Sequence, residues 1–595
     1  MVPFLLAKME RLDMWRTGLD RCAPDGLAFA SWIGMASAAL AISLIAAPAA
    51  QAQLENPFGL PNTSVSGSVG FAGGLYGASG IGARRPTARS ELSADLSFEI
   101  LGLESGLNLL YSTESSSLRQ SMNRLGFSWS WDWGQVEAGT VSPNYSKYSL
   151  NGASLRGGAV ELTPGPVDLA VSAGRSQRAV SLSSEQGFRQ AAFERWLYAA
   201  RLGVGEKERS HAHLVGTLAR DVRSSLDQAG SARPAENFTL TPDLGMSLFD
   251  GRVRLQTEAT LSAFTRDTRT QEVDLGVPVP EFLFTPRVGS RIDYAGTSRL
   301  QLDLDAFQFD ASYERVQPGF RSLGLSRTRS DQEVIRLSPQ VQVLGGRLSV
   351  GLDLKRVRNN LLGQRTVEQR QRQVGANVQA RLSRSVTVNG SYMWMANEHE
   401  PASDAALGQT LQRRFVTQTA TLSPSVTLRS GSVTHSLSLS GNYQRLDDQP
   451  GFQVGESSGG QGQGGTSANL TTTASYSLSF PSGLSLSLSG NYLYNDGRGR
   501  TTTTAYGTSA SAGYAFFGRR LRLNLTGGWS ENRSSSARGS DRQTRQLRLN
   551  GTASYRLPFG DTLRLKGRFL SNQSVEGTGR AFQEGQLTLR YSHQF

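Results

Sequence analysis

Apolar and polar residues alternate one by one along most of the chain after residue 62. In residues 91–100, Leu92, Leu96 and Phe98 occupy one parity, while serine and acidic residues occupy the other. The same alternation recurs in segments such as RLSVGLDLK, THSLSLSGNY, GLSLSLSGNYLY and DTLRLKGRF. Alternation with a period of two predicts β-strands that have one apolar and one polar face. A slip of one residue would exchange the two faces, so the pattern also fixes the register.

The connections between these segments alternate between short and long. Short ones include FDG, LGGR, FPSG and PFGD, and long polar ones include residues 266–280, 358–372, 447–467 and 530–544. Tight periplasmic turns that alternate with longer external loops are typical of transmembrane barrels. We therefore predict an all-β fold, a single large antiparallel transmembrane β-barrel of about 26 strands, within a range of about 22–26. A β-solenoid would need a constant short repeat, and a series of sandwiches would need bulky cores and linkers.

The composition agrees with a membrane barrel. Only 38% of the residues are hydrophobic, and 65 are glycine, whereas soluble domains are nearer half apolar. Intrinsic disorder would also give high polarity, but the strict alternation argues against it. The net charge of +13 is spread along strands and loops, so we predict no nucleic-acid partner.

The beginning of the chain has the order of a secretory signal. Basic residues come first, an uncharged run spans residues 27–47, and small residues at Ala50 and Ala52 follow. We predict a signal peptide over residues 1–52, a short periplasmic segment over 53–62 and the barrel over 63–595. A retained membrane anchor is the alternative, because the run is long enough to span a bilayer. The single cysteine, Cys22, lies in the predicted signal, so the exported chain would fold without disulfides.

The end of the chain, EGQLTLRYSHQF, places apolar residues at alternating positions before a final phenylalanine. It resembles the C-terminal assembly signal of Gram-negative outer-membrane β-barrel proteins. The positions that carry the resemblance are Leu587, Leu589, Tyr591 and Phe595. The resemblance implies an integral outer-membrane protein that the barrel assembly machinery recognises. The last strand should pair with the first, because an open edge in hydrocarbon would leave backbone groups unpaired.

Charged residues on the polar parity should line the lumen. We call one set the basic wall; its members are Arg522, Arg548, Arg556, Arg564, Lys566 and Arg568. The acidic set comprises Asp303, Asp305, Asp310 and Glu314. In a closed barrel these two sets lie roughly across from each other and would make a transverse field. The alternative is a solvated lumen in which the charges pair with one another.

Tryptophans fall on the apolar parity, and we expect them to form an aromatic girdle at the membrane interface, at the periplasmic side for those next to the WDWG turn. These residues are Trp129, Trp131, Trp133, Trp394 and Trp529. A carbohydrate track inside the lumen is the alternative, but these rings share a face with leucine and valine.

Motifs of catalysis are sparse. His211 and His213 lie two residues apart and hence on one face of a strand, a spacing that can hold a metal. No carboxylate or cysteine cluster adjoins them in sequence, so we predict no metal site, no cofactor and no enzymatic activity. Residues 148–179 are less repetitive than their surroundings. They and residues 267–290 are where we expect any segment that folds into the pore.

These observations favour a large passive channel for polar or charged solutes. The alternative is a barrel filled by a separate periplasmic or lipoprotein partner and used for export or surface assembly of a polymer. Outer-membrane lipids should surround the barrel. Arginine-rich external loops, such as RSSSARGSDRQTR, should bind the phosphates of lipopolysaccharide, because guanidinium pairs with phosphate through two hydrogen bonds.

Overall fold

The computed structural model describes residues 63–594 with short gaps. The gaps are residues 101–102, 114–123, 181–190, 207–208, 227–229, 275, 277–279, 328, 402–412, 451–464, 498–499, 538, 540, 558–559 and 578. The predicted signal peptide, the segment 53–62 and Phe595 therefore lie outside the described residues.

The described chain forms 26 strands and one 3-10 turn, η1 (Arg223–Ser225). The strands are β1 (Thr63–Ser79), β2 (Ala88–Ile100), β3 (Leu103–Ser112), β4 (Arg124–Trp131), β5 (Gly134–Val141), β6 (Leu155–Leu162), β7 (Val167–Gln177), β8 (Glu194–Gly205), β9 (His211–Val222), β10 (Glu236–Leu248), β11 (Val253–Thr265), β12 (Arg291–Leu304), β13 (Phe307–Val316), β14 (Gln332–Val343), β15 (Leu348–Arg358), β16 (Val367–Arg381), β17 (Val386–Pro401), β18 (Arg413–Ser430), β19 (Val433–Pro450), β20 (Gly465–Ser479), β21 (Ser485–Gly497), β22 (Thr501–Phe516), β23 (Leu521–Ser536), β24 (Arg542–Arg556), β25 (Thr562–Glu576) and β26 (Phe582–Gln594). No helix in the described ranges is long and apolar enough to cross a membrane.

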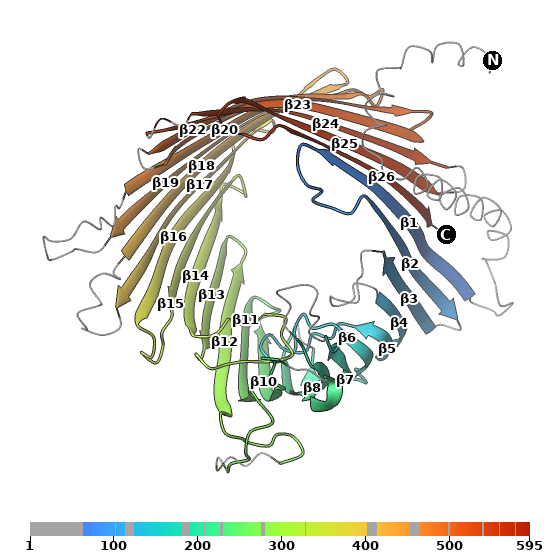
Figure 1. Ribbon diagram of the computed structural model, residues 1–595, viewed down its shortest axis with the longest axis vertical. Coiled ribbons are helices and arrows are strands. Elements are labelled where there is room, and N and C mark those ends of the chain that lie inside the picture. Colours follow the sequence, from blue (N-terminus) through green and yellow to red (C-terminus); the bar gives the residue numbers. More distant parts are fainter. Residues whose placement is uncertain are drawn as a thin grey trace, which may run out of the picture.

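The strands form one closed antiparallel ring (Figure 1). Each strand pairs with the next along the chain, and β1 pairs with β26 from Ser68 opposite Gln594 to Ser79 opposite Gln583. Closure gives the edge strands hydrogen-bond partners, which a strand in hydrocarbon requires. The predicted single antiparallel barrel of about 26 strands is confirmed, and so is the pairing of its last strand with its first.

The two faces of the ring differ in chemistry. Leu202 and Leu214, directly opposite each other on β8 and β9, are 59% and 47% exposed on the outer face. Thr217 and Thr239, opposite each other on β9 and β10, are buried on the inner face, where their hydroxyls lie 2.5 Å apart. An apolar outer surface around a polar interior is what a bilayer requires of a barrel. The protein is thus an integral outer-membrane β-barrel.

Several stretches predicted as long loops are strands instead. The connection predicted over residues 358–372 spans only 359–366, and the one predicted over 530–544 spans only 537–541. Polar residues continue the ladders there, because cross-strand ion pairs stabilise them. Arg545 Nε lies 2.8 Å from Glu531 Oε2, and Arg370 Nη1 lies 3.0 Å from Glu400 Oε2. High polarity alone does not distinguish a loop from a strand that rises above the membrane.

Candidate functional site

All six residues of the basic wall lie on the inner face of β23, β24 and β25. Arg522 and Arg564 both lie opposite Ser554, and Arg568 lies opposite Asn550. Their sequence neighbours Leu547 and Leu565 are 42% and 41% exposed on the outer face. The predicted parity therefore agrees with the positions of the six side chains, and their part in solute passage stays a prediction.

The basic wall carries positive charge that nearby carboxylates do not neutralise. In the part of the chain that the structure describes, none of its six members forms an ion pair with an aspartate or glutamate. Their side chains are exposed rather than packed against other strands. Like charges gathered on one low-dielectric wall raise the local concentration of the opposite ion.

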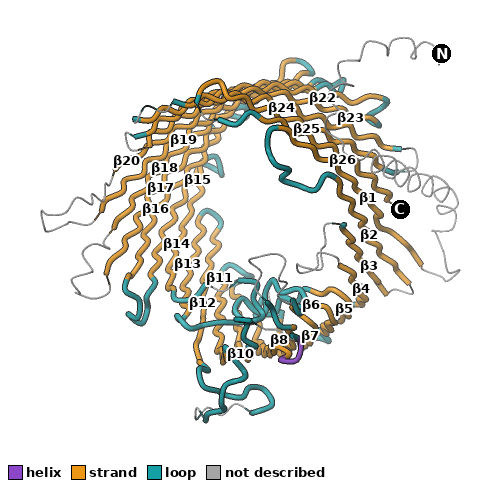
Figure 2. The backbone as a smooth tube through the Cα atoms, in the orientation of Figure 1, coloured by secondary structure: helices purple, strands orange, loops and turns teal. Residues whose placement is uncertain are grey.

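The connection between β1 and β2 adds two more arginines to this side of the ring. It bends back inside the ring beside β26 (Figure 2). Arg84 Nη1 lies 3.4 Å from Glu584 Oε1, and the Arg84 guanidinium lies 5.3 Å from the centre of the Phe582 ring. Arg85 Nη1 donates to Gln586 Oε1 at 3.2 Å. These contacts hold both arginines against the inner face of the last strand.

Arginines from three elements meet around one hollow of about 400 Å³. Arg84 and Arg85 come from the β1–β2 connection, Arg548 from β24 and Arg568 from β25. Among the described residues, the one carboxylate in its lining is Glu584. A guanidinium presents a planar fork of N–H donors that matches a carboxylate or a phosphate. The hollow is thus suited to a small anion, and we call it the four-arginine hollow.

Most of the predicted acidic set lies across the ring from the basic wall, on β12 and β13 (Figure 1). There, however, the charges are paired. Asp310 Oδ2 lies 2.5 Å from Arg299 Nη2, and Glu314 Oε2 lies 2.8 Å from Lys147 Nζ. Asp303 lies opposite Gln308, which donates to it at 3.3 Å. The two sides therefore differ: the acidic side is largely neutralised, and the basic wall is not.

The prediction for Asp305 is wrong. This residue lies in the tight turn between β12 and β13 rather than on the polar face of a strand. Its φ of 28° marks a turn backbone that aspartate tolerates better than most residues. The alternation of polar and apolar residues continues through Asp305, so the sequence does not show where the strand ends. The hairpin that interrupts the two strands has only two residues.

One corner of the barrel is filled by its own chain. Residues 142–154, between β5 and β6, fold against the inner face of β6–β9, and we call them the infolded segment (Figure 2). Tyr145 is 1% exposed and Leu150 is fully buried among Leu155 and Leu197. The connection between β13 and β14 lies against the segment, where Ser322 Oγ donates to the Ser149 carbonyl at 2.7 Å. This corner holds the largest apolar core of the described chain.

Polar contacts fix the infolded segment to the wall. Glu258 of β11 accepts hydrogen bonds from Ser146 Oγ at 2.7 Å and from the backbone N–H of Lys147 and Tyr148, both at 3.2 Å. Burial raises the pKa of the Tyr145 phenol to about 12. Burial also raises the pKa of the Tyr148 phenol, so both rings stay neutral at ordinary pH.

The infolded segment only partly matches the predicted one. Residues 148–154 belong to the predicted stretch 148–179, but the rest of that stretch forms the barrel strands β6 and β7. The described residues of the range 267–290 extend below the ring of strands in Figure 1. They pack instead against the β9–β10 side, where Thr268 N–H donates to the Pro234 carbonyl at 2.8 Å. A cluster of apolar residues in a polar loop could have indicated the infolded segment from the sequence. These residues are Tyr145, Tyr148 and Leu150.

The predicted tryptophan girdle splits into two rows. Trp129 and Trp133 are 44% and 50% exposed at the short-turn end of β4, and Trp131 contacts Trp133 edge-on at 5.3 Å. Trp394 and Trp529 each lie eight residues along their strands from the short-turn end. At about 3.3 Å per residue and a tilt of about 40°, this is a height of about 20 Å. We expect these two at the external interface and the three next to the WDWG turn at the periplasmic interface, and a role of all five in a girdle stays a prediction.

The predicted assembly signal lies on the outer face of the terminal strand. Leu589 and Tyr591 lie opposite Leu565 and Leu563, and Leu587 is 46% exposed. The buried Asp561, in the β24–β25 turn, accepts a hydrogen bond from Tyr591 Oη at 2.7 Å. The same carboxylate pairs with His593. Recognition by the assembly machinery stays a prediction.

Asp561→Asn should destabilise the barrel by about 1.5–3 kcal/mol, because a hydrogen-bonded charge at the closing strand is lost. Urea titration of the folded protein in lipid vesicles would measure this change. The matched control is Asp132→Asn, in the exposed β4–β5 turn. Equal stability of the two variants would show that Asp561 does not hold the terminal strand.

No protein-family model matches the chain, and no curated protein matches its sequence. Several solved structures are similar to parts of it at low sequence identity. They include OccAB2 of Acinetobacter baumannii (10% identity, 61% of this chain and 92% of that chain, TM-score 0.30), OccK8 (OprE) of Pseudomonas aeruginosa (12%, 67% and 96%, TM-score 0.29) and Pseudomonas aeruginosa OpdK with vanillate (12%, 61% and 93%, TM-score 0.29). Likeness at this level assigns neither a family nor a solute to the chain.

Proposed function

We propose that the barrel is a passive channel for polar solutes and that it favours anions. The observation that carries this proposal is the four-arginine hollow on the inner face, beside a basic wall without paired carboxylates. Solutes that present a carboxylate or phosphate would bind its guanidinium groups through paired N–H donors. Because the hollow is open to the lumen side, binding would be transient, as passage requires.

The paired acidic side supports the same direction of selectivity. Asp310 and Glu314 hold Arg299 and Lys147, so their charges add little field to the lumen. The unpaired positive charge on the opposite side then sets the sign of the potential. The infolded segment narrows the ring on a third side and would limit the size of the solute.

Lipopolysaccharide binding at the external rim is a second expectation. Arginines there are held by carboxylates, as Arg413 is by Asp448 at 2.5 Å. A guanidinium has five donors, so a paired arginine keeps N–H groups that can reach a phosphate. The alternative function is export of a polymer with a separate partner. No contact among the described residues supports it.

Single-channel recording tests the proposal. The folded barrel without residues 1–52 should give a steady conductance in a planar bilayer. Under a salt gradient, its reversal potential should show that chloride is more permeant than potassium. The preference should grow as ionic strength falls, because salt screens the charges of the basic wall. Cation preference, or no conductance from a demonstrably folded barrel, would refute the proposal.

A further inference from the structure

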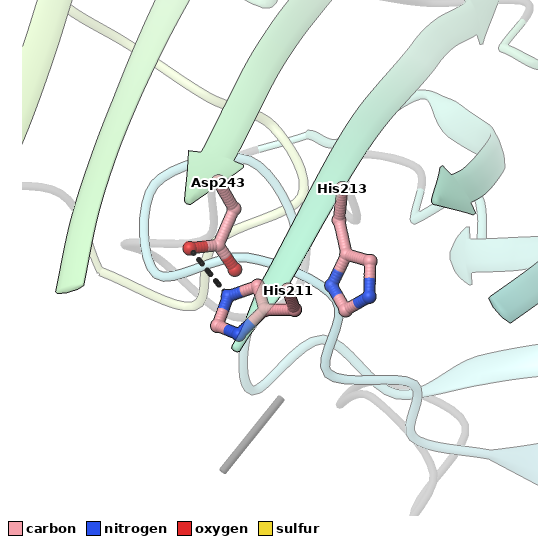
Figure 3. A group of neighbouring side chains, drawn as sticks. All are labelled: His211, His213 and Asp243. Atoms are coloured by element: carbon pink, nitrogen blue, oxygen red, sulfur yellow. Dashed lines mark ion pairs between the residues drawn. The ribbon is translucent and has the colours of Figure 1, made fainter. Parts of the chain in front are cut away.

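Two histidines and an aspartate converge on the inner face of the barrel, on the side opposite to the four-arginine hollow. His211 and His213 come from β9, and Asp243 comes from β10 (Figure 3). Their nearest donor atoms all lie within 4.8 Å of one another. The two imidazole rings stack at 4.7 Å, and His211 Nε2 lies 3.3 Å from Asp243 Oδ1. The register of β9 against β10 brings Asp243 directly opposite His213.

The imidazole nitrogens are buried without sufficient hydrogen bonding. The side chains of His211 and His213 are 2% and 1% exposed. Three ring nitrogens have no partner with hydrogen-bond geometry in the described part of the chain. They are both nitrogens of His211 and Nδ1 of His213. Buried polar groups are nearly always paired, so each exception calls for an explanation.

Glycines on the neighbouring strands make room for both rings. A Cβ at Gly245 of β10 would overlap the His211 ring, and a Cβ at Gly203 of β8 would overlap the His213 ring. Gly205 lies opposite His211 on the other side of the ladder. The rings therefore lie flat across positions that lack side chains. The glycines thus leave space that the two imidazole rings occupy, and this packing fixes the positions of the ring nitrogens.

A second carboxylate orients His213. Asp168 Oδ2 lies 3.5 Å from His213 Nε2, and the Gly205 carbonyl lies 3.4 Å from the same nitrogen. Arg201 holds Asp168 at 2.9 Å. With Nε2 directed at these acceptors, Nδ1 of His213 faces His211 and Asp243 (Figure 3). A histidine that ligates a metal commonly donates its other N–H to a carboxylate or a carbonyl in this way.

We propose that His211, His213 and Asp243 bind a divalent transition-metal ion, of which zinc is the test case. Two imidazoles and one carboxylate are a donor set that zinc accepts, with a fourth position left for water. Donors at about 2.0–2.2 Å from zinc lie about 3.3 Å apart in a tetrahedral site. Rotations of the side chains would bring the present spacing to this value.

The ion can approach from the periplasmic mouth. A hollow of about 720 Å³ lies at the short-turn ends of β6–β11, and its lining includes Gly205 and Ser210. These two residues flank the start of β9, where His211 lies. We expect a hydrated cation to reach the site through this hollow, whose lining includes no member of the basic wall.

The metal would also stiffen the filled corner of the barrel. Arg201, which holds Asp168, lies over the Tyr145 ring of the infolded segment at 5.1 Å. An ion on His213 would therefore connect β9 and β10 to the contacts that support this segment.

Calorimetric titration of zinc into the folded, tag-free barrel in detergent tests the site. Wild type should bind one zinc ion per chain, and His211→Ala should weaken binding by at least 100-fold. Gly245→Ala keeps all three ligands but displaces the His211 ring, and we expect at least a tenfold loss. The control is His435→Ala, on β19, where His435 bonds Tyr476 of β20. It should bind like wild type.

Cobalt absorption gives an independent readout of the coordination. Cobalt in place of zinc should give wild type an absorption band typical of nitrogen and oxygen ligands, and Asp243→Asn should shift it. Asp243→Asn changes no volume, so it decides the matter if the histidine variants fail to fold. The proposal is overturned if folded wild type binds no zinc, or if neither Gly245→Ala nor Asp243→Asn alters binding.

Discussion

Neutralising Arg548 and Arg568 together should lower the anion-to-cation permeability ratio of the channel by about tenfold. Both side chains line the four-arginine hollow and are free of carboxylate partners in the described chain. A unit charge about 6 Å from a passing ion changes its energy by about 0.7 kcal/mol in water, and by about 0.4 kcal/mol at about 0.1 M salt. Anions and cations respond in opposite directions. Each arginine therefore changes the ratio by about fourfold at this distance, and less for ions that pass farther away.

Reversal potentials of Arg548→Gln/Arg568→Gln under a salt gradient would measure the change. The matched control removes the same charge from two exposed short turns, as Arg384→Gln/Arg519→Gln. It should keep the ratio of wild type. If both double variants lower the ratio equally, the net charge of the barrel sets selectivity and the four-arginine hollow does not. If neither variant changes it, the proposed anion preference lies elsewhere.

The faces of the strands could be predicted from the sequence because each strand separates lipid from water. Arg522 and Leu523 are neighbours in sequence, yet one must face the lumen and the other the bilayer. The cost of placing arginine in hydrocarbon enforces this choice at every strand. The parity of residues such as Lys566 and Asp310 therefore follows from local pattern alone. The number of strands follows from the same pattern, since each strand has to cross the apolar layer once.

Contacts between distant strands could not be predicted in this way. Asp243 joins His211 and His213 only because β9 and β10 pair in one particular register. Asp168 reaches the same site from β7, two strands away from β9, and no spacing in the sequence indicates this. Most of the infolded segment could not be predicted for a related reason. Its apolar residues are too few to form a pattern. Their partners on β6–β9 lie on the inner face of the barrel, where side chains would normally be exposed to water.

Leu150→Asp should release the infolded segment from the wall and raise the single-channel conductance. Leu150 is fully buried between Leu155 and Leu197. A carboxylate there would lack a partner, and an unpaired buried charge costs several kcal/mol. We expect this cost to outweigh the remaining contacts of the segment, so the segment should leave while the barrel strands stay paired. Leu150→Ala, which leaves a cavity, should destabilise the folded protein by about 2–5 kcal/mol without full release.

Two measurements separate release of the segment from general unfolding. Conductance should rise in Leu150→Asp, and trypsin should cut after Lys147, which wild type holds by its ion pair with Glu314. The control is Leu362→Asp, since Leu362 is 49% exposed in the β15–β16 connection; it should change neither. If trypsin cuts at Lys147 but the conductance is that of wild type, the segment is mobile in the variant and yet does not restrict the pore. The four-arginine hollow would then be the remaining determinant of passage, because the infolded corner would contribute stability alone.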